Sequence, residues 1–174
     1  MNAPSKILVY GYGNPGRGDD GLGPALVAAL EPLGASDLTC ESDYQLSVED
    51  SATLAGYDVV VFVDADAQAP EPFCFDRVQP SRELSFSSHS ATPGQVVALA
   101  HEMFGSQVKG YALGIRGYHF DELCDSLSEP ARANLARALS FARRALTEQH
   151  FDEYTRQFGV VSDGNCACDP QLEA

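Results

Sequence analysis

The residues of this sequence that could do chemistry are a few acids and one histidine, and each follows a predicted strand. The pair Asp19–Asp20 comes after the glycine-rich run GYGNPGRG, which itself follows the apolar stretch ILVY. Asp64 and Asp66 end the β-branched run DVVVFVDAD, and His89 lies in the small, serine-rich loop SFSSHSATPG. Two carboxylates and an imidazole suit a divalent first-row metal and leave coordination positions open for substrate or water.

Strands must bring these distant residues together. The continuous apolar runs at 7–10 and 58–63 predict buried strands of a sheet that is covered on both faces. The carboxyl ends of parallel strands meet at one edge of a sheet, and open α/β proteins bind their ligands there. We therefore expect Asp20, Asp64 and His89 at the same edge.

The remaining predicted elements alternate between strand and helix. Further strands are expected at 38–41, 73–78 (nearer an edge of the sheet) and 111–115, with helices at 21–30, 47–56, about 94–104 and 129–149. This alternation implies an α/β sandwich with a mostly parallel sheet. We expect a single domain over residues 1–150, followed by a polar, flexible C-terminal tail over residues 151–174.

Composition narrows the classes of partner. Lysine and arginine total 11 against 25 acids, which gives the 174 residues a formal net charge of -14. Such a charge repels nucleic acid and anionic membranes, so neither is expected as a partner. No apolar run is long enough to span a membrane and no signal-peptide pattern is present, which predicts a cytoplasmic protein. Five cysteines, an odd number, favour reduced thiols over a disulfide framework.

The run GYGNPG also fits the dinucleotide-binding pattern G-x-G-x-x-G. That pattern needs free backbone N–H groups at the start of a helix, where they meet the pyrophosphate. Pro15 removes one such donor, and the carboxylates of Asp19 and Asp20 would repel a phosphate at that place. A nucleotide-binding α/β domain stays open as a weaker alternative, and it predicts that a dinucleotide raises thermal stability.

Each of these residues also has an ordinary structural explanation. Acids at a helix N-terminus are stabilised by about 0.3–1 kcal/mol through the helix dipole, so capping accounts for one member of the pair Asp19–Asp20. An aspartate at a strand end, such as Asp64, is common in turns. A single histidine is more often structural or exposed than a ligand, and His89 differs because its loop can approach the edge that holds the two acids.

Five short motifs occur in the order that is typical of one known family. The segment GYGNPGRGDDGLGP looks like the opening G-x-G-N-x-x-x-x-D-[DE]-x-x-G of that family, and QLSVED, VFVDADA, SSHSATP and IRGY follow it. Together they cover roughly residues 6–145. In this ordered set the sequence resembles the [NiFe]-hydrogenase maturation proteases, endopeptidases that trim the hydrogenase large subunit.

The resemblance implies a fold and a site. The fold would be a three-layer α/β sandwich of the phosphorylase/hydrolase-like kind, with a mostly parallel twisted sheet and helices on both faces. Asp20, Asp64 and His89 match the three residues that contact nickel already inserted in the immature large subunit. Some members of the family carry glutamate where this chain has Asp20. Asp19 and Asp66 are neighbouring acids that could take the place of Asp20 and Asp64.

The implied reaction is hydrolysis of one peptide bond near the C-terminus of the large-subunit precursor, by an aspartic-type endopeptidase. Nickel would arrive with the precursor, and no permanent organic cofactor is implied. Either the nickel polarises the scissile carbonyl or activates water, or it serves as a recognition check while a carboxylate acts as general base. The partner is then the large-subunit precursor, and the protein itself is expected to be a monomer.

Other protease chemistries lack their motifs. The sequence contains neither H-E-x-x-H nor G-x-S-x-G. Cys40 and Cys124 have no obvious histidine partner, and Ser88 and Ser90 are adjacent to His89, where a nucleophile and its base rarely meet correctly. The tail pair Cys166-x-Cys168 is interpreted as incidental. A non-catalytic nickel-binding maturation chaperone remains the main alternative, and it predicts tight metal uptake without a shortened large subunit.

Overall fold

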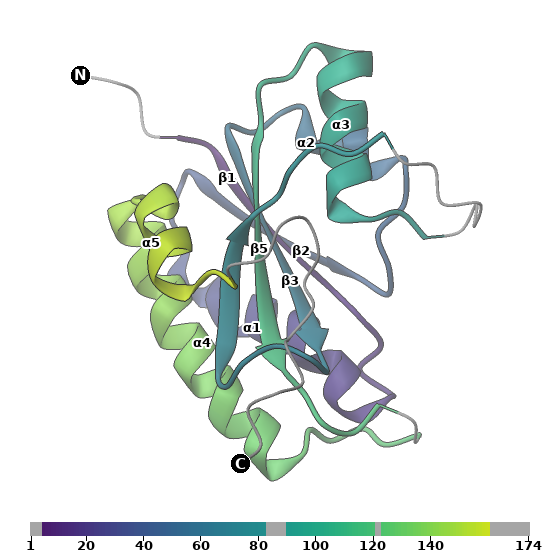
Figure 1. Cartoon of the computed structure of the whole chain (residues 1–174), viewed down its shortest axis with the longest axis vertical. Helices are drawn as coiled ribbons and strands as arrows, with labels where there is room; N and C mark the ends of the chain where they lie inside the picture. The colour runs from purple at the N-terminus through teal and green to yellow at the C-terminus, as the bar shows by residue number, and fades with distance from the viewer. Residues whose placement is uncertain (1–4, 83–89, 121–122, 161–174) are drawn as a thin grey trace.

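The computed structural model describes residues 5–82, 90–120 and 123–160, which form a sheet between two layers of helices (Figure 1). The strands are β1 Ile7–Tyr12, β2 Leu38–Asp43, β3 Val59–Asp66, β4 Phe73–Arg77 and β5 Lys109–Arg116. The helices are α1 Leu22–Leu30, α2 Asp50–Leu54, α3 Pro93–Phe104, α4 Glu129–Glu148 and α5 Phe151–Phe158, and the 3-10 turns are η1 Gly18–Gly21 and η2 Glu31–Leu33. The predicted α/β fold class is confirmed.

The strands are arranged in the order β2-β1-β3-β5-β4. All neighbours are parallel except β4, which runs antiparallel to β5 and forms the edge that the sequence predicted. Gly11 of β1 is paired with Val63 of β3, and Asp64 is paired with Gly114 of β5. The carboxyl ends of β1, β3 and β5 therefore finish at the same edge. The chain leaves β1 toward β2 and later returns to β3 on the other side, so the boundary between β1 and β3 is the topological switch point of this sheet.

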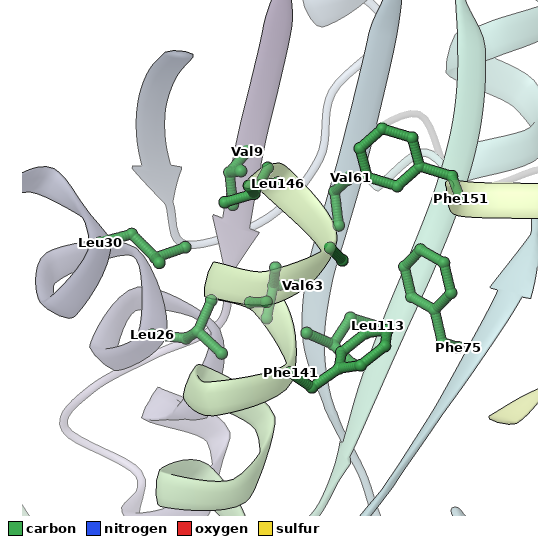
Figure 2. Close-up of a pocket in the computed structure, with 12 residues that line it drawn as sticks. Val9, Leu26, Leu30, Val61, Val63, Phe75, Leu113, Phe141, Leu146 and Phe151 are labelled. Carbon is green, nitrogen blue, oxygen red and sulfur yellow. The ribbon is translucent and has the colours of Figure 1, made fainter. Parts of the chain in front are cut away.

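Helices α1, α4 and α5 cover one face of the sheet, and α2 and α3 cover the other (Figure 1). The first face holds the larger core, in which residues such as Leu26, Val63 and Phe141 are buried. Figure 2 shows a void in this core, lined entirely by apolar side chains, with a volume of about 10 Å³. That is about the space of a single water molecule, so the void belongs to the packing of the core and does not form a binding site.

Two glycines let α1 approach the sheet closely. A Cβ atom at Gly23 would lie 2.5 Å from the carbonyl oxygens of both Tyr12 and Val63, and one at Gly11 would lie 2.5 Å from the carbonyl oxygen of Gly23. Only glycine avoids these contacts. The close packing places the start of α1, and the η1 turn before it, directly over the ends of β1 and β3.

The prediction of a flexible tail from residue 151 is wrong for its first part. Residues 151–158 form α5, whose Phe151 and Tyr154 are buried against the larger core. Asp152 fastens the helix to the sheet: it accepts hydrogen bonds from Arg77 Nη1 at 2.7 Å and from the hydroxyl of Tyr111 at 2.8 Å. The pair Cys166 and Cys168 lies outside the described residues. Within the described ranges, no helix is long and apolar enough to cross a membrane.

Candidate functional site

Asp20 and Asp64 lie at the carboxyl edge of the sheet, as their positions in the sequence predicted. Asp20 comes from η1, and Asp64 comes from the end of β3, whose neighbour β1 runs into η1. Both side chains are partly buried, and the negative charge of Asp20 acts on the Asp64 carboxyl. His89, the third predicted ligand, lies outside the described residues.

The two carboxylates have different hydrogen-bond partners. Asp20 Oδ2 accepts the backbone N–H of Asn14 at 2.9 Å, and this bond closes the glycine-rich loop over the turn. Asp64 Oδ1 accepts the N–H of the adjacent Ala65 at 2.8 Å, and the hydroxyl of Tyr12 in β1 also donates to the Asp64 carboxyl. The Asp20 carboxylate is therefore held by the loop before it, whereas Asp64 is held by the strand that ends there.

Burial raises the pKa of the Asp64 carboxyl to about 7. The N–H of Ala65 and the hydroxyl of Tyr12 act in the opposite direction, while the negative charges of Asp20 and Asp66 raise the pKa further. A carboxyl with a pKa near neutrality can take up or release a proton at physiological pH. Perturbed acids of this kind, next to a second acid at a ligand-binding edge, are typical of functional sites.

Asp19 has a structural role that the sequence did not reveal. Its side chain is 0% exposed and accepts four hydrogen bonds, from Ser128 N at 2.7 Å, Ser128 Oγ at 2.8 Å, Tyr118 N at 2.8 Å and His119 N at 3.0 Å. Burial alone would raise the pKa of Asp19, but these donors outweigh it and hold the pKa below its ordinary value. Asp19 thus binds a distant segment, and capping of its own helix does not explain it.

The glycine-rich loop has its backbone donors already occupied. In the stretch 13–20, every N–H group donates within the protein, and Pro15 has none to donate. The acceptors are Asp43 O for Gly13, Asp20 Oδ2 for Asn14, Asn14 Oδ1 for Gly16, Asn14 O for Arg17, Cys124 O for Gly18, His119 O for Asp19 and Arg17 O for Asp20. A pyrophosphate would have to break these bonds, which argues against the nucleotide-binding alternative.

Asp66 and Arg116, two neighbours of the site, are engaged in turns. Asp66 Oδ1 accepts the N–H of Gln68 at 2.7 Å, which is ordinary turn chemistry. Arg116, from the motif IRGY, donates from Nη1 to the carbonyl oxygen of Ala69 at 2.9 Å, and its guanidinium carbon lies 5.4 Å from the centre of the Tyr118 ring. Arg116 therefore packs the turn between β3 and β4 against the start of the segment after β5.

A cavity next to η1 was not predicted from the sequence. It has a volume of about 370 Å³, and its lining includes Gly18, aromatic side chains of Tyr118 and Phe120, and the polar Ser126. Gly18 and Tyr118 belong to two of the motifs, but the motifs do not predict the cavity, because it arises where η1 meets a segment a hundred residues away. Among the described residues, no group of three or more histidine, cysteine, aspartate or glutamate side chains could hold a metal ion.

Comparison with solved structures places this fold. The [NiFe] hydrogenase maturation protease HycI from Thermococcus kodakarensis KOD1 is 24% identical, with a TM-score of 0.65 over 83% of this chain and 95% of that one. The hydrogenase maturating endopeptidase HybD from E. coli is 22% identical, with a TM-score of 0.65 over 83% and 94%. The [NiFe] hydrogenase maturation protease HybD from Thermococcus kodakarensis is 19% identical, with a TM-score of 0.59 over 81% and 99%.

No protein-family model and no curated protein sequence matches the chain. The likeness to these solved structures covers most of both chains and therefore concerns the whole fold. The chain has the fold of the hydrogenase maturation proteases, the family that its motifs resemble.

Proposed function

We propose that this chain is an endopeptidase of hydrogenase maturation, which removes the C-terminal extension of a [NiFe]-hydrogenase large-subunit precursor after nickel has been inserted. One observation carries the proposal. In a fold shared with maturation proteases, Asp20 and Asp64 occupy the sheet edge where such α/β proteins bind ligands, and Asp64 has a pKa raised to about 7.

The proposed roles follow from the kind of each side chain. Asp20 and Asp64 would offer carboxylate oxygens, and His89 an imidazole nitrogen, to the nickel that the precursor brings. The metal then belongs to the substrate. Asp64 is the better general base of the two acids, because burial already makes proton uptake favourable near neutral pH.

The test is incubation of purified nickel-loaded precursor with the protein, followed by mass spectrometry of the large subunit. We expect the wild-type chain to shorten the precursor at one bond, and Asp20→Asn, Asp64→Asn and His89→Ala to leave it at full length. The matched control is Asp58→Asn, which lies at the other end of β3 and accepts the backbone N–H of Lys6 at 2.8 Å. That variant should cleave at the wild-type rate.

Precursor without nickel provides the second comparison. It should stay uncleaved with the wild-type chain, because the three proposed ligands would then have no ion to contact. A wild-type chain that takes up nickel tightly but never shortens the loaded precursor would contradict the proposal and favour the non-catalytic nickel-binding chaperone. Normal cleavage by all three site variants would show that the reaction takes place elsewhere on the protein.

A further inference from the structure

Asp19 is a buried acid that the proposed chemistry does not use. It precedes Asp20 directly, and its carboxylate receives four hydrogen bonds from residues 99 to 109 positions away in the chain. We propose that Asp19 is a positioning residue for the site: it ties η1 to the segment formed by residues 117–120 and 123–128, and thereby fixes where the Asp20 carboxylate stands. The expected effect of Asp19 on catalysis rests on the proposed function. Its effect on the position of the Asp20 carboxylate does not.

Backbone hydrogen bonds show how closely the two stretches are joined. Gly18 N donates to Cys124 O at 2.7 Å, Cys124 N donates to Gly16 O at 3.0 Å, and Asp19 N donates to His119 O at 2.9 Å. Gly18 has a φ of 58°, and a Cβ atom there would lie 2.8 Å from His119 O. The turn and the segment therefore form one hydrogen-bonded unit, with the Asp19 carboxylate at its centre.

The segment is itself held by α4, a long helix of the core. Asn134 of α4 donates from Nδ2 to the carbonyl oxygen of Arg116 at 3.1 Å and to the hydroxyl of Tyr118 at 3.0 Å. Ser128, which donates twice to Asp19, is also the N-cap of α4 through its contact with Ala131 N. Asp19 thus connects a short 3-10 turn to the long helix α4 through Ser128.

The position of Asp20 depends on that connection. Asp20 Oδ2 accepts the N–H of Asn14 at 2.9 Å, and Asn14 Oδ1 accepts the N–H of Gly16 at 2.9 Å. If η1 loses its anchor at Asp19, the next residue in the turn moves, and the bond from Asn14 lengthens or breaks.

Amide NMR of the full chain tests the positioning without any assumption about function. In Asp19→Asn we expect faster hydrogen exchange at the amides of Tyr118, His119 and Ser128, which lose their charged acceptor. We also expect faster exchange and a changed chemical shift at the amide of Asn14, which touches Asp20 and not Asp19. An Asn14 amide that keeps its wild-type shift and protection, while the other three lose theirs, would overturn the proposal.

Kinetics with nickel-loaded precursor tests the consequence for the site. Asp19→Asn should lower kcat about 10- to 100-fold, as the loss of a group supporting a metal ligand typically does, with little change in KM. The control is Asp152→Asn. This substitution removes a carboxylate of α5, away from the carboxyl edge, that accepts hydrogen bonds from the side chains of Arg77 and Tyr111. That variant should keep the wild-type kcat, and an equal fall in kcat for both variants at equal folded fraction would contradict positioning.

Ser128→Ala provides a milder variant if Asp19→Asn does not fold. It removes the hydroxyl donor at 2.8 Å and leaves the three backbone donors in place. The Asn14 amide should change in the same direction by a smaller amount, and an unchanged Asn14 amide would again contradict the proposal. If the wild-type chain cleaves no precursor, the proposed protease function fails, and the NMR comparison still decides the role of Asp19.

Discussion

Asp19 and Asp64 lie at the same end of the sheet and have opposite surroundings. Asp19 is completely buried, and four N–H and O–H donors converge on it, so its pKa lies below the ordinary value. Burial raises the pKa of Asp64 to about 7, the negative charge of Asp20 raises it further, and the donors Ala65 N–H and Tyr12 hydroxyl only partly offset this. Two neighbouring acids therefore have pKa values that move in opposite directions.

This difference shows that the balance between burial and hydrogen-bond donors decides the charge state of such a carboxyl. Donors that converge on a carboxylate compensate for the lost water and turn the acid into a fixed anion that holds the fold. A buried carboxyl with fewer donors has a raised pKa, so it can bind a proton or a ligand near neutral pH. The fold surrounds Asp19 with four donors and leaves Asp64 buried beside a second acid with a raised pKa, and such perturbed acids are typical of functional sites.

The largest expected effect is a loss of precursor cleavage, which should be much greater for a substitution of Asp64 than for one of its neighbour Asp66. Asp64→Asn should lower precursor cleavage by at least about 1,000-fold, or roughly 4 kcal/mol of transition-state stabilisation, because an amide cannot replace the anionic ligand or the base. Asp66→Asn should lose less than about tenfold, since an amide oxygen can still accept the N–H of Gln68. Single-turnover cleavage assays measure both, and the reverse order would assign the role to Asp66.

The next effect is on stability. Asp19→Asn should lower the free energy of unfolding at pH 7 by about 3 kcal/mol, because the amide group turns one acceptor into a donor that faces other donors. Because the folded-state pKa of Asp19 is lowered, its stabilising effect is present at neutral pH and is lost as the pH falls through that value. Urea titrations should therefore show the difference narrowing toward acid pH. A loss below about 1 kcal/mol at pH 7 would mean that the four bonds contribute little.

The sheet and the position of Asp64 could be predicted because they depend on local patterns. A β-branched run with an acid at its end predicts a central strand, and β3 indeed carries Asp64 at its carboxyl end. The strands extend further than the apolar runs, to Tyr12 in β1 and Asp66 in β3, because pairing with neighbours continues past the last apolar residue.

The role of Asp19 could not be predicted, because the tertiary fold brings its hydrogen-bond donors to it from a distant part of the chain. Three of the four are backbone N–H groups, of Tyr118, His119 and Ser128, and any residue type other than proline could supply them.

Helix α5 was also missed. Its few apolar residues are stabilised by rings elsewhere in the chain, as where Phe158 lies 5.1 Å from Phe141, measured between ring centres. The helix does have a local pattern, because Phe151, Tyr154 and Phe158 stand at the i, i+3, i+7 spacing of an amphipathic helix, which the prediction of a polar tail overlooked.

A smaller loss of stability is expected when the exposed carboxylate of α5, Asp152, is substituted than when Asp19 is. Asp152 also accepts from two partners, Arg77 and Tyr111, but its side chain is 56% exposed. Water and salt screen such a pair, so Asp152→Asn should cost only about 0.5–1 kcal/mol in the free energy of unfolding, and less in high salt. The urea titration used for Asp19→Asn measures it, and an equal cost for the two substitutions would contradict the importance of burial.

The last comparison concerns the stability of Asp64→Asn as a function of pH. Because the folded-state pKa of Asp64 lies above its ordinary value of 3.8, the folded chain holds this proton up to about pH 7. Raising the pH through that range ionises a carboxyl that the fold disfavours, so the wild-type chain loses stability there and the asparagine variant does not. The melting temperature of the variant minus that of the wild type should rise by about 4–8 °C between about pH 5 and pH 7, which corresponds to roughly 2 kcal/mol, and should stay level at higher pH. A difference for Asp64→Asn that stays constant with pH would mean that Asp64 ionises as easily as an exposed acid, and the contrast with Asp19 would then lie in hydrogen bonding alone.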